Sequence, residues 1–258
     1  MDLFERFKRE CKSYYDGIIN YGIFSADELE RLLVRIDENL PKNNISPAIH
    51  RVFEALKATS FEEIIAIILA QDPYPHAKTA TGVAFETRDN SIPPTLKNIL
   101  KEVYKDRGMN LDEIFKGVPS KKYKIDLRSW TNQGVLLLNT YFTTDEGKRG
   151  SHKDLGWEEL TSAIIKAIDK RSQQEKEKVV FMLWGNDSIK VGIKNLLSDI
   201  NEYRGILVAT HPGQQSFKND SEIGQAFKGC DYFNKTNGYL EKKINWDTVI
   251  KDSLGKTL

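Results

Sequence analysis

Four short clusters of polar, aromatic and turn-forming residues stand out as places where chemistry could occur. They are QDPYPH (71–76), NTYFTT (139–144), WGND (184–187) and THPGQQS (210–216). The clusters supply a carboxylate at Asp72, an amide at Asn139 and an imidazole at His211. An anion and hydrogen-bond donors held in one site can stabilise the opposite charges that develop when a polar bond breaks.

Each cluster follows a short apolar run that is typical of a buried parallel strand. The runs cover residues 64–70, 134–139, 179–184 and 205–210, and helical patterns lie between them at about 95–105, 156–170 and 187–199. This alternation predicts an α/β fold, a three-layer α/β/α sandwich with a central, mostly parallel four-stranded sheet. Because ligands bind outside the carboxyl ends of parallel strands, the four clusters are expected to form one site.

The first sixty residues carry helical patterns of a different kind. Ser25 and Glu28 form a capping-box pattern, and leucines and isoleucines recur after them at helical spacing. A further helix is expected to start at Ser46, with Pro47 in its first turn. The chain has 258 residues, of which 40% are hydrophobic, which is enough for one sizeable core. We therefore expect a single domain over residues 1–258, with residues 1–60 as its N-terminal helical portion.

The composition gives no strong electrostatic pull toward a polyanion, because 38 Lys and Arg nearly balance 37 Asp and Glu. Any contact with nucleic acid must come from a local face. No run of about 18 apolar residues occurs, so the chain is expected to be soluble and cytoplasmic, or nuclear in a eukaryote, or in the host-cell cytoplasm for a virus. Cys11 and Cys230 are expected to be buried free thiols, and no metal or cofactor is expected.

The clusters and their flanking residues resemble, in identity and in order, the main (family 1) uracil-DNA glycosylase family. The resemblance runs from Ile64 to Trp246 over five blocks: QDPYP with GVAF, IPPTLKNI, GVLLLNTYFTT with SHKDLGW, LWGN, and HPGQQS with KGCDYFNKTN. Five ordered blocks are a specific signal, whereas one alone would be weak. The resemblance implies a monofunctional hydrolase of base excision repair, which removes flipped-out uracil from DNA and leaves an abasic site.

The resemblance also implies two catalytic residues. Cleavage of an N-glycosidic bond develops positive charge on the sugar and negative charge on the departing base. Asp72 would orient or activate the attacking water and stabilise the sugar cation, and His211 would donate a hydrogen bond to uracil O2. Taken alone, Asp72 before Pro73 also suits a turn, and His211 before Pro212 also suits an ordinary loop.

Four residues are implied to bind the base: Gln71, Tyr74, Phe85 and Asn139. The Asn139 amide can donate to O4 and accept from N3–H, whereas cytosine would leave buried groups unpaired at a cost of roughly 1–3 kcal/mol each. Phe85 would stack on uracil, and Tyr74 would stand against C5 and exclude the methyl group of thymine. From local sequence alone, Asn139 also suits a strand end, and Phe85 and Tyr74 also suit a core.

A second group of residues is implied to contact DNA: Pro94, Thr95, Asn186, Gly213, Gln215 and Ser216. Hydroxyl and main-chain N–H groups can bind phosphates without adding much charge, which suits a nearly neutral protein. The alternatives are helix capping for Thr95 and turn formation for Asn186 and Ser216. His152 in SHKDLGW also matches a family motif, although it equally suits capping of the following helix.

Three departures from the family pattern concern DNA binding. The family has a histidine after the tyrosine of the first block, where this chain has Pro75 followed by His76. The family reads HPSPLS where this chain reads HPGQQS, so Gly213 lacks a hydroxyl and Gln215 replaces a leucine wedge. Because an apolar wedge fills the space left by a flipped base, the glutamine predicts a stronger preference for single-stranded DNA.

Two other classes of function compete with this interpretation. One is a replication-associated DNA-binding subunit built on the glycosylase fold, and the other is an α/β nucleoside hydrolase. Retention of Asp72, Phe85, Asn139 and His211 argues against a loss of catalysis, and the PPT and HPGQQS loops argue for a substrate with phosphates. The expected partner is uracil-containing DNA, single- or double-stranded, bound by a monomer without membrane association. The sequence identifies no protein inhibitor and no replication partner.

Overall fold

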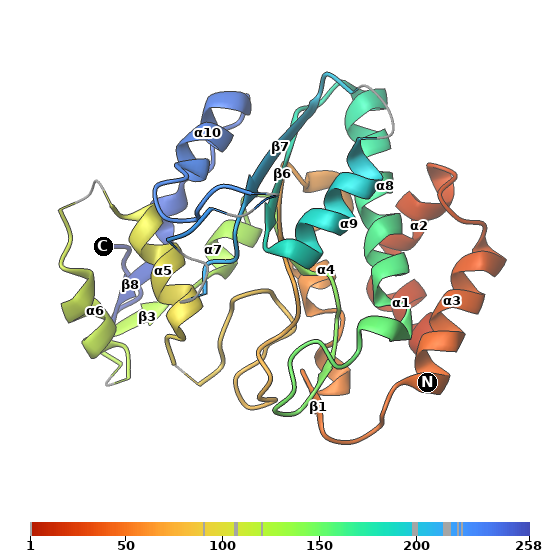
Figure 1. The fold of residues 1–258 in the computed structure, drawn as a ribbon, viewed down its shortest axis with the longest axis horizontal. Coiled ribbons are helices and arrows are strands. Elements are labelled where there is room, and N and C mark those ends of the chain that lie inside the picture. Colours follow the sequence, from red (N-terminus) through yellow and green to blue (C-terminus); the bar gives the residue numbers. More distant parts are fainter. Residues whose placement is uncertain are drawn as a thin grey trace.

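A sheet of four parallel strands runs through the centre of the molecule, in the order β4-β2-β6-β7 (Figure 1). The computed structural model describes residues 2–89, 91–105, 108–119, 121–197, 201–213, 218–220, 222 and 224–258. The strands are β2 (Ala66–Ala70), β4 (Val135–Asn139), β6 (Val179–Trp184) and β7 (Arg204–Ala209). All four predicted strands are therefore confirmed, with ends that differ by at most two residues.

The pairing register of the central sheet places the carboxyl ends of neighbouring strands side by side. Ala70 pairs with Asn139, and Trp184 pairs with Ala209. Residues of β2, β4 and β6 are buried at every position, as expected of a sheet covered on both faces. The polar residues that follow these strands consequently emerge at one edge of the sheet.

Helices cover both faces, which confirms the predicted three-layer α/β/α sandwich (Figure 1). One face packs on α8 (Trp157–Glu175) and α9 (Asn186–Leu196). The helices α1 (Leu3–Glu10), α2 (Lys12–Asn20) and α3 (Ala26–Asn39) lie outside them. The other face packs on α5 (Pro94–Val103), α7 (Arg128–Thr131) and α10 (Tyr232–Tyr239), while α4 (Glu54–Ala58) lies beside β4.

Alternation along the strands builds two separate apolar cores. Leu69 and Leu138 point to the α8 side, whereas Ile68 and Leu137 point to the α5 side. Neighbouring side chains of a strand point to opposite faces, so each buried strand supplies both cores. The sheet is thereby clamped between two packed layers, and its carboxyl edge becomes a rigid platform.

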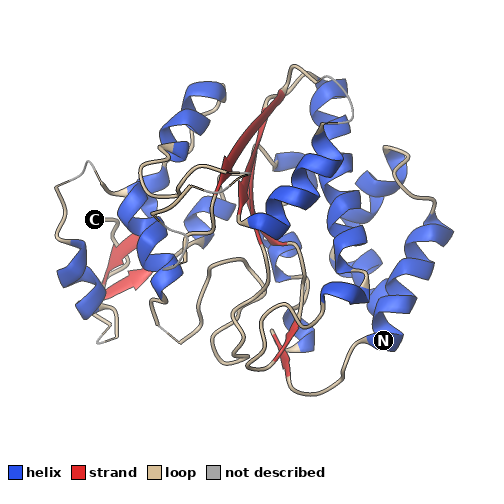
Figure 2. Cartoon of the chain, viewed as in Figure 1, coloured by secondary structure: helices blue, strands red, loops and turns tan. Residues whose placement is uncertain are grey.

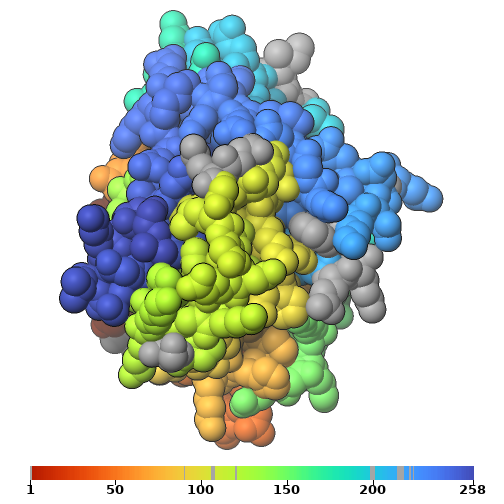
Figure 3. Space-filling model, turned by 90° about the vertical axis from the view of Figure 1, so that its left-hand side faces the viewer, coloured from red at the N-terminus to blue at the C-terminus, as the bar shows by residue number. Residues whose placement is uncertain are grey.

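Short elements complete the fold outside the central sheet, as the separate red strand pairs in Figure 2 show. They are β1 (Ile45–Ser46) paired with β5 (Thr144–Asp145), β3 (Tyr123–Ile125) paired with β8 (Ile250–Asp252), helix α6 (Leu111–Gly117), and the 3₁₀ turns η1 (Ile49–Arg51), η2 (Phe61–Glu63), η3 (Lys153–Leu155) and η4 (Trp246–Thr248). Figure 3 shows the dark blue C-terminal segment beside the yellow-green residues of the α6 and β3 region.

The N-terminal region follows one expectation and departs from another. The capping box of Ser25 and Glu28 starts α3 as predicted. The helix expected at Ser46 is wrong: Ser46 ends β1, and its hydroxyl donates a 2.6 Å hydrogen bond to the carbonyl of Tyr74 instead of capping a helix. Cys11 and Cys230 are buried free thiols, as predicted. Among the described helices, none is long and apolar enough to cross a membrane.

Candidate active site

A cavity of about 110 Å³ opens at the carboxyl ends of β2 and β4. Three of the four polar clusters contribute to its wall, through residues 71–74, Asn139 and His211. The WGND cluster does not line it. The wall includes all six residues that the sequence implies for catalysis and base binding: Gln71, Asp72, Tyr74, Phe85, Asn139 and His211. Parallel strand order thus brings together residues that are up to 140 positions apart.

Asp72 lies just beyond the end of β2 and is half-buried. The main-chain amide of Gly150 donates a 3.3 Å hydrogen bond to its Oδ2. Burial raises the pKa of the Asp72 carboxyl, while the Gly150 amide and the cations Arg149 and Lys153 oppose this rise. The carboxylate is therefore partly desolvated but still supported as an anion, a state that can stabilise a nearby positive charge.

His211 follows β7 and faces the same cavity. The main-chain amide of Gly213 donates a 3.0 Å hydrogen bond to Nδ1 of His211. Burial, helped by the positive charge of Arg149, lowers the pKa of His211 from 6.5 to about 4. The imidazole is consequently neutral at pH 7, and because Nδ1 accepts a hydrogen bond, its proton sits on Nε2.

Asn139 is the last residue of β4 and is only 4% exposed. Within the described part of the chain, its side-chain amide makes no hydrogen bond to another protein group. A buried amide that faces a cavity offers a donor and an acceptor side by side to whatever fills that cavity. The strand-end interpretation of Asn139 is confirmed, and its place in the cavity wall is compatible with the predicted role in base binding.

Two aromatic residues form the apolar part of the wall. The ring of Phe85 is 8% exposed and lies with its centroid 5.6 Å from that of Trp184. The Tyr74 hydroxyl donates a 3.3 Å hydrogen bond to the Phe85 carbonyl, and burial raises the pKa of Tyr74. Both rings belong at once to the core and to the cavity, so the two interpretations of these residues do not exclude each other.

The implied phosphate contacts lie at the rim or beyond it. Thr95 lines the cavity as a buried residue of the first turn of α5, and Pro94 is exposed at its first position. Capping by Thr95 is wrong, because Pro93 is the residue that precedes the helix. The Asn98 amide, which the sequence did not single out, donates a 2.8 Å hydrogen bond to the Pro212 carbonyl and ties α5 to the His211 loop.

The remaining DNA-contact residues are only partly placed. Asn186 is exposed and is the first residue of α9, so it lies in a helix rather than in a turn. Gly213 is placed by its hydrogen bond to His211. Gln215, predicted to stand in place of a wedge, and Ser216, predicted to contact a phosphate, lie outside the described residues.

Arg149 is the main site residue that sequence reasoning missed. It lines the cavity from the loop between β5 and η3, directly before the SHKDLGW block. On either side of it, Gly147 donates to the Pro75 carbonyl at 2.7 Å and Gly150 donates to Asp72. Its adjacency to a recognised block was the available signal. Its charge acts on the pKa of both Asp72 and His211.

Residues 152 and 153 brace the same loop. His152 is 3% exposed, with Nδ1 2.8 Å from the Thr143 hydroxyl and Nε2 3.0 Å from Asp145. His152 is the residue that precedes η3, but its side chain makes no capping hydrogen bond, so capping by the imidazole is wrong. Lys153 pairs with Asp187 at 2.7 Å, which connects the loop over Asp72 to the start of α9. Among the described residues, no group of three or more His, Cys, Asp or Glu could hold a metal ion.

Comparison with solved structures places the fold. The crystal structure of a mimivirus uracil-DNA glycosylase matches with a TM-score of 0.70 at 23% identity, over 91% of this chain and 86% of that one. The structure of a mimivirus UNG variant in complex with UGI matches with a TM-score of 0.67 at 22% identity, over 92% of this chain and 88% of that one. The structure of the UNG of Nitratifractor salsuginis matches with a TM-score of 0.57 at 17% identity, over 92% of this chain and 97% of that one. At these identities the likeness shows a shared fold.

Comparison of sequences gives the family. The profile described as "Uracil DNA glycosylase superfamily" matches residues 62–241. A uracil-DNA glycosylase of Aliarcobacter butzleri is 38% identical over 221 residues, which are 85% of this chain and 92% of that protein. One from Borrelia turicatae is 35% identical over 240 residues, which are 92% of each chain. The resemblance expected from the five blocks is confirmed, and the chain belongs to the uracil-DNA glycosylase superfamily.

Proposed function

We propose that the protein is a monofunctional uracil-DNA glycosylase, which hydrolyses the bond between flipped-out uracil and deoxyribose and leaves an abasic site. The observation that carries this proposal is the convergence of Asp72, Asn139 and His211 on one cavity with an aromatic wall. An anion, an amide and a neutral imidazole are the groups that this reaction needs around the sugar, the base edge and the departing oxygen.

On the sugar side, the reaction uses the carboxylate of Asp72. As the C1′–N1 bond breaks, positive charge spreads over the sugar, and the carboxylate stabilises it. A water adds to C1′, and its proton passes to the carboxylate, which acts as a general base. The hydrogen bond from Gly150 holds one carboxylate oxygen and so orients the group. Partial desolvation strengthens its attraction to the cation.

On the base side, uracil leaves with the electron pair of the broken bond. The negative charge on its O2 is met by Nε2–H of His211, which carries the proton because Nδ1 accepts from Gly213. A neutral imidazole suits this role, since the donor keeps its proton and stabilises the anion by a hydrogen bond. The lowered pKa of His211, about 4, keeps the imidazole in that state.

Selection of uracil follows from the polarity and shape of the wall. The Asn139 amide donates to O4 and accepts from N3–H, and cytosine reverses both groups. Phe85 provides a stacking surface for the base. Tyr74, held by its hydrogen bond to the Phe85 carbonyl, stands where a 5-methyl group would lie and excludes thymine.

The proposal that the enzyme has no lyase activity rests on which of the described residues line the cavity. A lyase step requires a lysine that forms a Schiff base with the sugar. The described residues that line the cavity include no lysine. Lys78, the nearest one in sequence to the first block, is exposed and does not line the cavity.

The proposed partner is uracil-containing DNA, single- or double-stranded, bound by a monomer in the cytoplasm. Thr95 at the cavity and Pro94 and Asn186 outside it would contact phosphates. The polar groups of the cavity and the phosphate contacts around it each weigh against one alternative function. A replication-associated binding subunit would not need Asp72 and His211, and a nucleoside hydrolase would not need the phosphate contacts.

The decisive experiment incubates the protein with a uracil-containing oligonucleotide in EDTA and then cleaves abasic sites with alkali. Uracil release, an intact strand before alkali, and no reaction with a thymine-containing oligonucleotide are expected. Strand cleavage without alkali, or a borohydride-trapped covalent complex, would refute the monofunctional assignment. Cleavage of free deoxyuridine at a comparable rate would favour the nucleoside hydrolase. DNA binding without uracil release would favour the binding subunit.

A further inference from the structure

The backbone of Phe85 adopts a conformation that its residue type disfavours. Its φ is +65°, in the left-handed region that glycine occupies readily and bulky residues avoid. The Glu86 amide donates a 3.3 Å hydrogen bond to the Val83 carbonyl, so Phe85 is the third residue of a tight turn. A positive φ at this position is what a type II turn requires. An aromatic residue stays in this conformation only where its surroundings hold it there.

Hydrogen bonds hold the turn from the cavity side and from the sheet. The Ala84 amide donates a 3.2 Å hydrogen bond to the Leu137 carbonyl of β4, and Tyr74 donates to the Phe85 carbonyl. These contacts fix the residues up to Phe85. The next residue, Glu86, must be fixed as well, because the conformation of Phe85 is set by the chain on both of its sides.

Glu86 is held by an ion pair with two parallel contacts. Arg128 Nε lies 2.9 Å from Oε1 of Glu86, and Arg128 Nη2 lies 3.2 Å from Oε2. The same Nη2 lies 3.7 Å from Glu54 on α4. The two carboxylates are 13% and 21% exposed and the arginine 35%. Exposed single pairs contribute little, but this fork has fixed geometry and the Glu86 carboxylate is largely screened from water.

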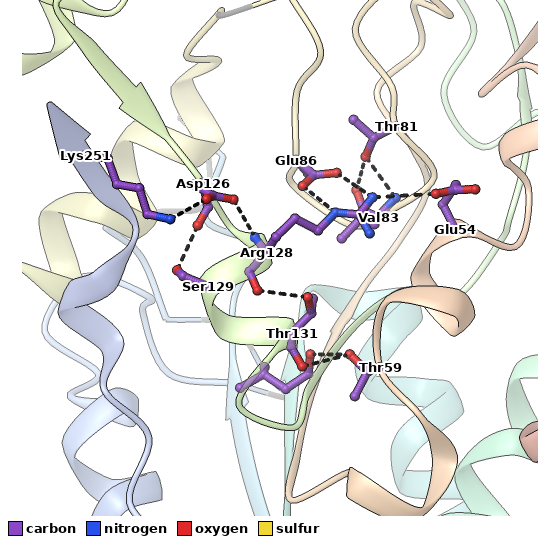
Figure 4. A network of polar contacts seen from close by, with 11 residues as sticks. Glu54, Thr59, Thr81, Val83, Glu86, Asp126, Arg128, Ser129, Thr131 and Lys251 are labelled. Atoms are coloured by element: carbon purple, nitrogen blue, oxygen red, sulfur yellow. Dashed lines mark hydrogen bonds and ion pairs between the residues drawn. The ribbon is translucent and has the colours of Figure 1, made fainter. Parts of the chain in front are cut away.

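Arg128 is itself anchored at its main chain (Figure 4). Its amide donates to Asp126 Oδ1 at 3.2 Å, and its carbonyl accepts from the Thr131 hydroxyl at 3.1 Å. Asp126 is held in turn by Lys251 of β8 at 2.6 Å. Figure 4 shows the side chain of Arg128 reaching from α7 to the loop of Val83 and Glu86. The guanidinium therefore has a rigid base from which to hold Glu86.

We propose that Glu54, Glu86 and Arg128, here named the Arg128 bridge, form a positioning device that holds the ring of Phe85 where the base stacks. The inference rests on the proposed function, and it adds three residues to the machinery of that site. Without the bridge, Phe85 is free to relax toward an ordinary negative φ, which turns its ring out of the plane that the base requires. Binding of uracil then weakens although Asp72, Asn139 and His211 are untouched.

The test is a double-mutant cycle with a single-stranded uracil-containing oligonucleotide as substrate and free uracil as a competitive probe of the pocket. Glu86→Ala and Arg128→Ala should each lower kcat/KM about tenfold and weaken inhibition by uracil by a similar factor. In a Phe85→Ala background, the same substitutions should have almost no further effect, because the ring that they position is gone. Equal losses in both backgrounds would overturn the proposal.

Two further variants separate positioning from general stability. Arg128→Lys keeps the charge but loses the fork, so it should fall between the wild type and Arg128→Ala. Arg204→Gln breaks the pair of Arg204 with Asp169, 3.0 Å long and even more buried, which lies away from the cavity. It should lower the thermal midpoint and leave kcat/KM unchanged. An equal activity loss in Arg204→Gln would overturn the proposal, whereas a wild type that releases no uracil would refute the proposed function.

Discussion

A Cβ atom placed on Gly213 would lie 2.8 Å from Nδ1 of His211, closer than real contacts allow. The main-chain amide of Gly213 uses this proximity to donate a 3.0 Å hydrogen bond to that nitrogen. The missing side chain of Gly213 leaves room for the imidazole, and its main-chain amide selects the tautomer with the proton on Nε2. This chain departs from the family's serine at this position, and the local geometry gives the departure a physical consequence.

Gly213→Ala should therefore displace the imidazole and lower kcat by about tenfold to a hundredfold, since small misplacements of a catalytic group are costly. KM should change much less, because the base is held chiefly by other residues. Steady-state kinetics on a uracil-containing oligonucleotide measure both. Gly238→Ala is the matched control, since nothing lies within 4 Å of its added Cβ. Equal kcat values for the two variants would contradict this account of Gly213.

Arg149→Gln should move the acid limb of the pH–activity profile to higher pH. Removing the cation stabilises protonated His211, whose pKa of about 4 rises, and it also removes support for the Asp72 carboxylate, whose pKa rises further. Both changes protonate a proposed catalytic group at a higher pH as the solution is acidified. In the wild type, activity should persist well below pH 6.5, the ordinary pKa of histidine.

The measurement for Arg149 is kcat/KM from neutral to acid pH at constant ionic strength. Lys148→Gln is the control, because Lys148 is a neighbouring exposed cation, whereas Arg149 is the cation that acts on the pKa of both Asp72 and His211. An acid limb that shifts equally in both variants would show a general effect of surface charge. An unshifted limb in Arg149→Gln would show that Arg149 does not act on the catalytic groups.

The sequence was sufficient to predict that Asp72 and Asn139, which follow apolar strands, lie at one cavity. Asp72 and Asn139 come together because β2 and β4 pair in register, and an apolar run is a strong local signal for such a strand. Arg149 was missed because its place depends on loop contacts, which have no period in the sequence. The helix expected at Ser46 failed because pairing of β1 with β5, across a hundred residues, overrides a local pattern.

The least predictable feature is the conformation of Phe85. Nothing in GVAF signals that a phenylalanine occupies a position that favours glycine. Its partners Glu86 and Arg128 are separated by 42 residues, and β8 joins from the far end of the chain. Such contacts arise only after the sheet has formed, so they belong to tertiary packing rather than to local preference.

Asp72→Asn should lower kcat by about a hundredfold to a thousandfold while leaving the affinity for uracil-containing DNA nearly unchanged. The amide keeps the shape of the carboxylate but neither stabilises the sugar cation nor accepts the proton of water. Single-turnover kinetics and equilibrium binding measure the two quantities separately. A loss of affinity that matches the loss of turnover would instead assign Asp72 a role in binding or folding.

Tyr74 offers a test of selectivity in which two functions of one residue can be separated. Its ring forms part of the cavity wall, and its hydroxyl donates to the Phe85 carbonyl. Tyr74→Ala removes both and should admit the 5-methyl group, so that slow excision of thymine becomes measurable. Tyr74→Phe removes the hydrogen bond alone and should still exclude thymine. Comparing release of uracil and thymine from matched oligonucleotides gives the discrimination of each variant.

The expected difference in thymine excision between Tyr74→Ala and Tyr74→Phe follows from the interaction that each substitution removes. Steric exclusion by a packed ring is lost only when the ring is lost, because a cavity opens beside C5 and the methyl group fills it. Loss of one hydrogen bond to Phe85 loosens the turn and should weaken uracil excision about threefold to tenfold without changing which base is chosen. If Tyr74→Phe excised thymine as readily as Tyr74→Ala, the hydroxyl rather than the ring would be the selecting group. If neither variant excised thymine, Tyr74 would not stand beside C5.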